Sequence, residues 1–274
     1  MRHVPSAVPD SAAPRPAPLR AASLEDALPG LWHGFTARLP DPGITPFADA
    51  LRAGLTGHGA DPRAPIYRLK QVHSPDLVVF PEHAGIRNAS DPPPPTSDEP
   101  EPPRADGAIL THGAGAIAVQ TADCVPILAV HRGRGEAAAL HAGWRGAAAG
   151  ILPRLLERWL AAGDSPAAIR LAFGPSIRAC CYAVRQDCTG AFDPAHLRGA
   201  VTHREGRMYL ELTRVLANQA MAHGLPADAI EILPHCTACH GEAARYPFAS
   251  YRRDGRPGLP FRDRNASVIG FAAR

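Results

Sequence analysis

Short alternations of apolar and polar residues run along most of the chain and predict a protein rich in β-strands. Residues 30–39 predict a first strand, and residues 66–80 alternate on both sides of a break at Ser74–Pro75, which favours two strands joined by a turn. Further on, the pattern predicts four short strands separated by glycine-rich turns, at 107–110, 115–120, 126–131 and 136–141. A buried strand at 168–177 and closing strands at 246–255 and 266–273 complete the set.

Helical periodicity occurs in three segments. Residues 147–162 repeat apolar side chains at every third or fourth position, which is typical of an amphipathic helix; the stripe comprises Ile151, Leu152, Leu155, Leu156, Trp159 and Leu160. Residues 208–226 predict a strand that leads into a second helix ending at Gly224–Pro226, and a short helix is expected at 46–59. Because strands and helices do not alternate regularly, the pattern predicts a mixed α+β fold rather than a doubly wound sheet.

Two proline-rich segments interrupt this pattern. The first twenty residues contain five prolines and lack the apolar run of a secretory signal, so we expect a disordered leader over 1–28 and a cytoplasmic protein. Residues 91–103 contain seven prolines and four acidic residues, which indicates a solvated, polyproline-like insert at 85–105. No run of about 18 apolar residues occurs, so neither a transmembrane helix nor a membrane partner is expected.

Charge and cysteine content narrow the possible partners. The 274 residues carry a formal net charge of +3, which is too small to indicate a nucleic acid as partner. Lys70 is the only lysine, so phosphate binding would fall to arginine side chains, whose guanidinium groups suit it. Six cysteines in a chain of this length do not make a disulfide scaffold, and they point instead to metal binding, catalysis or packing. The oligomeric state is not defined by the sequence.

Three segments each place a metal-binding side chain beside turn residues: His73 in KQVHS, Cys124 in TADCVP and His141 in HAGWRG. Two imidazoles and a thiolate suit zinc, and three protein ligands leave a fourth position for water or substrate. The long spacing requires that the ligands converge from different strands. The residue types alone leave a second interpretation open, in which Cys124 is a small buried hydrophobic residue and both histidines are hydrogen-bonded core residues.

Seven motifs, taken in order, resemble those of a known family: LKQVHS, ADGAIL, VQTADCVPIL, ALHAGWRGAAAGIL, FGPSIRACCYAV, PHCTACH and FASYRRDG. From about residue 30 to residue 272, the chain resembles the family first labelled multicopper polyphenol oxidase (laccase). That family contains the YfiH-type proteins, now described as purine nucleoside phosphorylases with adenosine deaminase activity. The resemblance implies one catalytic domain over 29–274, with a layered α/β/β/α arrangement in which a central mixed β-sandwich is flanked by helices. It also implies that His73, Cys124 and His141 bind one zinc ion, or copper in the same site.

This activity would take a nucleoside and phosphate as small-molecule partners. A zinc ion with an open position can activate water for deamination, whereas phosphorolysis needs a phosphate held by cationic side chains. Arg145, Asp106 and Cys124 are the candidate catalytic residues. The further candidates for contact with phosphate or substrate are Arg68, Lys70, Arg252 and Arg253. Each of these cations could instead form a surface or structural ion pair.

Two acidic residues are candidates for proton transfer. Asp106 lies in an Asp-Gly pair, which is also a plain turn signal. Asp123 would point away from Cys124 if the backbone there is extended, so Asp106 is preferred.

The segment HCTACH at 235–240 could supply a second zinc site. Because the resembling family carries CT-x-C without histidine ligands, we expect Cys236 and Cys239 to pack in a loop near the active site. Cys180 and Cys181 are adjacent, and neighbours on a strand diverge, so we do not expect them to share one ion.

The sequence also departs from the family pattern. Ser74 stands where glycine is usual, which is tolerable if its φ is negative, and the Gly-Gly-Val-Ser run after HGFTAR is missing. Besides a non-enzymatic metal-binding regulator, which only the missing N-terminal motif favours, two rival enzymatic functions stay open. One is a cysteine-nucleophile hydrolase or amidase of the peptidoglycan-editing type, using Cys124 and His141. The other is a copper-dependent polyphenol oxidase, although the chain lacks paired H-x-H motifs.

Overall fold

The computed structural model describes residues 17–39, 65–80, 101–111, 115–241, 247–255, 257–258 and 263–272, and its strands form three sheets. The six-stranded sheet has the order β12 (Ile230–Ile232), β8 (Ile169–Phe173), β6 (Val125–His131), β7 (Glu136–Ala142), β4 (Gly107–Leu110) and β3 (Leu77–Phe80). The four-stranded sheet has the order β1 (Leu31–Leu39), β13 (Arg264–Phe271), β5 (Ala116–Thr121) and β2 (Ile66–Tyr67). The three-stranded sheet has the order β10 (Val201–Arg204), β11 (Arg207–Leu210) and β9 (Ala183–Val184).

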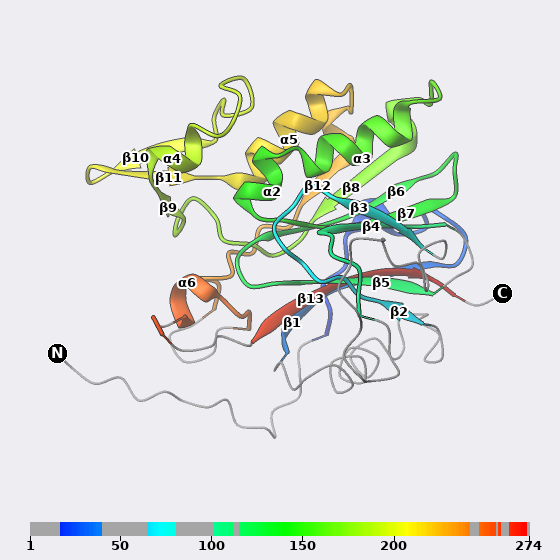
Figure 1. The fold of residues 1–274 in the computed structure, drawn as a ribbon, viewed down its shortest axis with the longest axis horizontal. Helices are drawn as coiled ribbons and strands as arrows, with labels where there is room; N and C mark the ends of the chain where they lie inside the picture. Colours follow the sequence, from blue (N-terminus) through cyan, green and yellow to red (C-terminus); the bar gives the residue numbers. More distant parts are fainter. Residues whose placement is uncertain are drawn as a thin grey trace.

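The six-stranded sheet is buried on both faces. Every residue of β6 is buried: Ile127 and Ala129 pack in the cluster beneath the helices, whereas Leu128 and Val130 pack toward the four-stranded sheet. A strand covered on both faces reads as a continuous apolar run, which explains the sequence of β6. Figure 1 shows α2 (Trp144–Ala148), α3 (Ile151–Leu160) and α5 (Leu212–Ala222) over one face of this sheet and the four-stranded sheet below the other. The expected sandwich and the mixed α/β class are confirmed.

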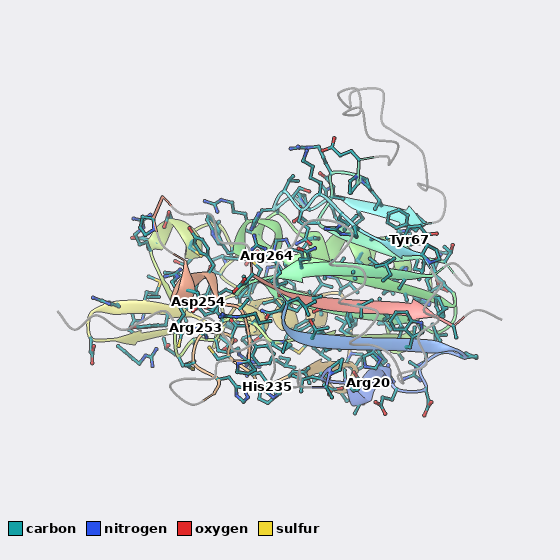
Figure 2. All side chains as sticks on the ribbon, turned by 90° about the horizontal axis from the view of Figure 1, so that it is seen from below. Arg20, Tyr67, His235, Arg253, Asp254 and Arg264 are labelled. Atoms are coloured by element: carbon teal, nitrogen blue, oxygen red, sulfur yellow. The ribbon has the colours of Figure 1, made fainter. Side chains whose placement is uncertain are left out.

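Most of the predicted strands are present. Those predicted at 30–39 and 266–273 correspond to β1 and β13, and the four short strands correspond to β4, β5, β6 and β7 within one residue at each end. The segment 66–80 forms only two short strands, β2 and β3, with a long loop between them. Figure 2 shows the four-stranded sheet from outside, with Tyr67 on β2 and Arg264 at the start of β13. The helix expected at 46–59 lies outside the described residues.

The helices differ from the predictions in two places. The helix predicted at 147–162 is two helices, α2 and α3, separated at Gly150, whose φ of 86° is a left-handed conformation that favours glycine. The strand predicted at 246–255 is wrong, because the described part of it contains α6 (Tyr251–Asp254). The Ser250 hydroxyl accepts a hydrogen bond from the Arg253 N–H at 3.2 Å, which caps this helix. Among the described residues, the remaining α-helix is α4 (Gln186–Thr189).

The disordered leader expected over 1–28 is too long a segment, because residues 17–28 are part of the fold. Leu19 pairs with Phe35 of β1, and the 3-10 helix Ala22–Leu24 buries Leu24 to 1% exposure. The Ser23 N–H donates to the Glu231 carboxylate at 2.7 Å, which fastens this segment to β12. Two further 3-10 helices, Pro166–Ala168 and Ala227–Ala229, precede β8 and β12. Within the described ranges, no helix combines the length and apolar character needed to cross a membrane.

The apolar stripe on α3 is confirmed, since Ile151, Leu152, Leu155, Leu156 and Trp159 are all buried. We expect Leu155→Ala to lower the free energy of unfolding by about 2–5 kcal/mol, because it removes a fully buried side chain and leaves a cavity. Urea denaturation followed by circular dichroism measures this. Arg158→Ala, at an exposed position on the same helix, should cost less than about 1 kcal/mol; equal losses for both would contradict the assigned packing of α3.

Candidate metal centre

Strand register brings two of the three expected metal ligands together. In the β6–β7 hairpin Val125 pairs with Ala142 and Pro126 with His141. Cys124, one residue before β6, therefore comes opposite Gly143 and on the same face as His141. His141 is buried, Cys124 is half-buried and His73 is exposed. One side-chain ligand atom from each of these three residues lies within 4.8 Å of the others. The structure therefore places the predicted triad in one group.

His73 reaches this group from the loop between β2 and β3. Its φ of 62° is left-handed, which is uncommon for a histidine and indicates a loop held in place by its surroundings. The Gln71 amide provides one restraint: it donates to the Gln120 carbonyl at 2.7 Å and accepts from the Gln120 N–H at 2.8 Å. Ser74 has no positive φ, so the absence of the usual glycine there causes no backbone strain.

A buried carboxylate connects the two histidines. Asp106, one residue before β4, is fully buried, and its Oδ1 lies 2.7 Å from His141 Nδ1. Its Oδ2 accepts from the N–H groups of Val72 and Ser74, at 2.9 and 2.7 Å, on both sides of His73. With Nδ1 of His141 bonded to the carboxylate, Nε2 is the nitrogen left for a ligand. Asp106 therefore fixes the His141 ring and the His73 loop together.

These contacts shift the protonation of all three groups. Burial raises the pKa of Asp106, but hydrogen bonds from His141, Ser74 and Val72 outweigh it and lower that pKa to about 2. Burial raises the pKa of the Cys124 thiol as well, yet the charge of His141 and hydrogen bonds from both histidines lower it to about 6. Burial lowers the pKa of His141, and the adjacent Cys124 thiolate and Asp106 raise it to about 9. Cys124 is therefore a thiolate near neutral pH, the form that binds metal.

A close approach of the backbone at Gly143 completes the group. A Cβ at this position would lie 2.8 Å from His73 Cδ2 and 3.0 Å from Cys124 Sγ, so only glycine fits without displacing a ligand. Gly143 also precedes α2, which carries Arg145 two residues away. The exposed Arg145 guanidinium stacks on the Trp144 ring at 4.4 Å. Of the candidate catalytic residues, Arg145 thus follows Gly143 by two residues, and its side chain contacts Trp144.

Asp123, the second acidic candidate, connects loops. It has a φ of 94° rather than the extended backbone considered above, and its carboxylate accepts from the Thr237 hydroxyl and from the Arg252 N–H, both at 2.7 Å. Arg252 is exposed, and its guanidinium donates to the Ala183 carbonyl at 3.1 Å and lies 5.4 Å from the Tyr182 ring. Neither the hydrogen bonds of Asp123 to Thr237 and Arg252 nor Tyr182 was identified from the sequence, because no local pattern marks a contact between such distant segments.

The other candidate cations are engaged by the protein. Arg253 donates to the carbonyls of Thr237 and Phe248, at 2.8 and 2.7 Å, and pairs with Asp254 (Figure 2). Lys70 pairs with Glu101 of the proline-rich insert.

Arg68 is half-buried just after β2. Two exposed candidates therefore remain. Arg145 lies two residues after Gly143, which is in close contact with the triad, and the backbone of Arg252 contacts Asp123, next to Cys124.

Four cysteines form a second group of possible metal ligands. The Sγ atoms of Cys180, Cys181, Cys236 and Cys239 lie within 4.8 Å of one another. The expectation that Cys180 and Cys181 diverge was wrong, because residues 179–181 form a turn and not a strand.

Comparisons with known proteins agree with the fold and the motifs. The chain is 36% identical to a purine nucleoside phosphorylase of Deinococcus radiodurans, over 61% of this chain and 62% of that protein. It is 35% identical to an adenosine deaminase from an unknown prokaryotic organism, over 54% of this chain and 57% of that one. Each match thus spans less than two thirds of the relative.

The crystal structure of YlmD from Geobacillus stearothermophilus superposes with a TM-score of 0.66 at 25% identity, covering 90% of this chain and 93% of that one. The family model described as multi-copper polyphenol oxidoreductase laccase matches residues 51–272, which is most of the sequence. The chain belongs to this family.

Proposed function

We propose that this chain is a zinc-dependent purine nucleoside phosphorylase that also deaminates adenosine. The observation that carries the proposal is the convergence of His73, Cys124 and His141, whose ligand atoms lie within 4.8 Å of one another. The names of the relatives, a purine nucleoside phosphorylase and an adenosine deaminase, supply the reaction types.

The donor set fits a catalytic zinc ion. Two imidazoles and one thiolate provide three ligands, and the bond from His141 Nδ1 to Asp106 orients the ring as in other metal sites. Copper is the alternative ion, since imidazole and thiolate ligands also suit it. A bound zinc ion would supply Lewis acidity and a water molecule of lowered pKa at its open position.

The residues around this site would serve the two reactions differently. In phosphorolysis a phosphate oxygen forms a bond to the anomeric carbon while the bond to the base breaks, and the base leaves with the electron pair and takes up a proton. We assign the guanidinium groups of Arg145 and Arg252 to holding the phosphate, because both residues are exposed, Arg145 follows Gly143 by two residues, and the Arg252 N–H contacts Asp123 next to Cys124. Tyr182, next to Arg252, is the aromatic candidate for contact with the base.

One geometric feature favours a second candidate. The ligand atoms of Cys124 and His141 lie within 4.8 Å of each other and His141 bonds to Asp106, which is the order of a nucleophile, a base and the group that orients the base in cysteine hydrolases. A polyphenol oxidase rests on the family description alone.

The test of the proposed function measures metal content and nucleoside turnover on the same preparation. With adenosine and phosphate, we expect adenine and ribose 1-phosphate; without phosphate, we expect inosine and ammonia. Chelation should abolish both reactions, and zinc should restore them. Activity that survives complete chelation but is lost in Cys124→Ser would overturn the zinc mechanism and support the hydrolase. Oxidation of a phenol by the copper-loaded protein, without nucleoside turnover, would support the oxidase.

We expect Asp106→Asn to raise the dissociation constant for zinc about 10- to 100-fold. Both carboxylate oxygens accept hydrogen bonds, and an amide nitrogen in place of one of them leaves either His141 or the His73 loop without its acceptor. Zinc competition with a chelating dye measures the change, and activity should return at saturating zinc.

The matched control for this variant is Asp164→Asn. Asp164 forms a second carboxylate–histidine pair with His131 of β6, at 3.6 Å, outside the triad. Zinc affinity should be unchanged in this control. If the zinc affinity of Asp106→Asn is also unchanged, Asp106 does not orient the metal ligands.

Arg252→Ala tests the phosphate contact. The variant removes the guanidinium but keeps the backbone N–H that donates to Asp123. We expect the KM for phosphate to rise about 10- to 100-fold, the equivalent of one charge-assisted hydrogen bond of about 1.5–3 kcal/mol. Deamination without phosphate should change far less. Arg214→Ala, at an exposed position on α5, is the control, and an equal change in both variants would exclude a specific contact.

A further inference from the structure

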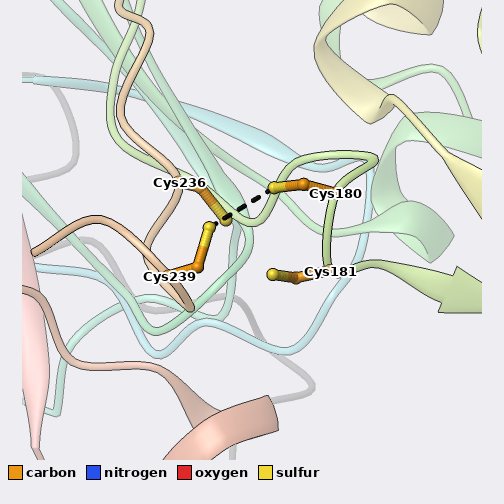
Figure 3. A group of neighbouring side chains, drawn as sticks. All are labelled: Cys180, Cys181, Cys236 and Cys239. Atoms are coloured by element: carbon orange, nitrogen blue, oxygen red, sulfur yellow. Dashed lines mark hydrogen bonds between the residues drawn. The ribbon is translucent and has the colours of Figure 1, made fainter. Parts of the chain in front are cut away.

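Four cysteines from two loops that are distant in sequence face one another in a group that shares no residue with the triad (Figure 3). Cys180 and Cys181 lie on the turn after β8, and Cys236 and Cys239 lie on the loop after β12. All four Sγ atoms are within 4.8 Å of one another, and those of Cys180 and Cys239 are 3.5 Å apart. None forms a disulfide.

We propose that these four sulfurs bind a second zinc ion, at a closed structural site separate from the triad. In a tetrahedral site with zinc–sulfur bonds of about 2.3 Å, neighbouring sulfurs are about 3.8 Å apart. This value lies between the 3.5 Å that separates the Sγ atoms of Cys180 and Cys239 and the 4.8 Å within which all four Sγ atoms lie. Four thiolates leave no open position, which is typical of a structural zinc site.

The backbone holds both loops in this arrangement without the ion. Ser176 and Cys236 form a parallel bridge, in which the Ser176 N–H donates to the His235 carbonyl at 3.2 Å and the Thr237 N–H donates to the Ser176 carbonyl at 3.0 Å. The Cys181 N–H donates to the Arg178 carbonyl at 2.8 Å, which closes the turn that directs the adjacent cysteines to the same side. The site is therefore formed by the fold and is not an accident of side-chain rotation.

An arginine side chain is hydrogen-bonded to the backbone of each of the two loops. The Arg204 guanidinium donates to the carbonyls of Ala179 and Cys180, at 2.6 and 3.1 Å. Arg253 donates to the Ala238 carbonyl at 3.3 Å in the other loop. A zinc ion with four thiolates carries two net negative charges, so a cation fixed to each loop offsets it.

The flanking histidines are not part of the ligand set. The rings of His235 and His240 pack edge to face at 4.6 Å, and each lies 5.9 Å from the Phe248 ring. They stack with one another beside the loop, and the group of ligand atoms within 4.8 Å contains only the four cysteines. The geometry thus selects an all-sulfur site over one of two cysteines and two histidines.

The test uses the full chain with the triad disabled by His73→Ala and Cys124→Ser, so that no activity enters the measurement. This variant should bind one Co²⁺ per chain, with the strong sulfur-to-cobalt absorption of tetrahedral thiolate ligation, and one Zn²⁺ should displace it. Adding Cys239→Ser should weaken that absorption and raise the dissociation constant for Co²⁺, because one of the four thiolates is lost. Cys239→His should restore metal binding, because imidazole also binds zinc and the position is exposed. Cys188→Ser, at a cysteine outside both groups, is the matched control and should bind like its parent.

Circular dichroism checks that each variant folds, and Cys180→Ser replaces any Cys239 variant that does not. Three results would overturn the proposal: no metal bound by the triad-disabled chain, binding that is insensitive to both Cys239→Ser and Cys180→Ser, or a mass lower by two hydrogen atoms that shows a disulfide within the group under reducing purification. Because the metal-binding measurements use a chain whose triad is disabled, a failure of this proposal and a failure of the proposed activity are distinguishable.

Discussion

The site depends on one buried carboxylate. Asp106 has no solvent exposure, and its charge is compensated by a histidine ring and two backbone N–H groups. A buried charge is tolerated only when it is paired and hydrogen-bonded, so each of its three donors is held in a fixed position. One donor is His141 and the other two flank His73, so Asp106 orients the His141 ring and holds the loop that carries His73. Cys124 is placed separately, by the register of the β6–β7 hairpin.

A second carboxylate has a comparable role on the other side of Cys124. Asp123 adopts a left-handed backbone at a φ of 94°, a conformation that costs a residue with a side chain about 1–3 kcal/mol. The two hydrogen bonds that this conformation makes possible, from Thr237 and Arg252, offset the strain. Strain and compensation occur at the residue next to a proposed metal ligand, where a loop must be held in one conformation for binding.

Local pattern and motif predicted much of this structure, and what they missed required long-range contacts. The alternation in β4 to β7 and the stripe on α3 depend on local periodicity, so their positions could be read from the sequence. The triad came from motifs and not from spacing. By contrast, α6 begins with a Ser250 cap inside a segment that reads as a strand, and the break at Gly150 divides a continuous apolar stripe. Two features follow only from the strand register and the loop geometry. One is that Asp106 bonds both to His141 and to the His73 loop, and the other is that Cys180 and Cys239 converge.

Hydrogen bonds to Asp123 connect the two groups of ligands, and one of them comes from the Ile177 N–H, in the loop that leads to Cys180, which donates to the Asp123 carbonyl at 2.9 Å. Thr237 follows Cys236 directly, Asp123 precedes Cys124 directly, and the Thr237 hydroxyl donates to the Asp123 carboxylate at 2.7 Å. Arg253 strengthens this connection, since it donates to the Thr237 carbonyl while its neighbour Arg252 donates to Asp123. An ion held by the four cysteines would fix the loop that carries Thr237, and through it the loop that carries Cys124. Loss of that ion would then loosen the triad without altering any of its ligands, so metal affinity at the triad would fall when the four-cysteine group is disrupted.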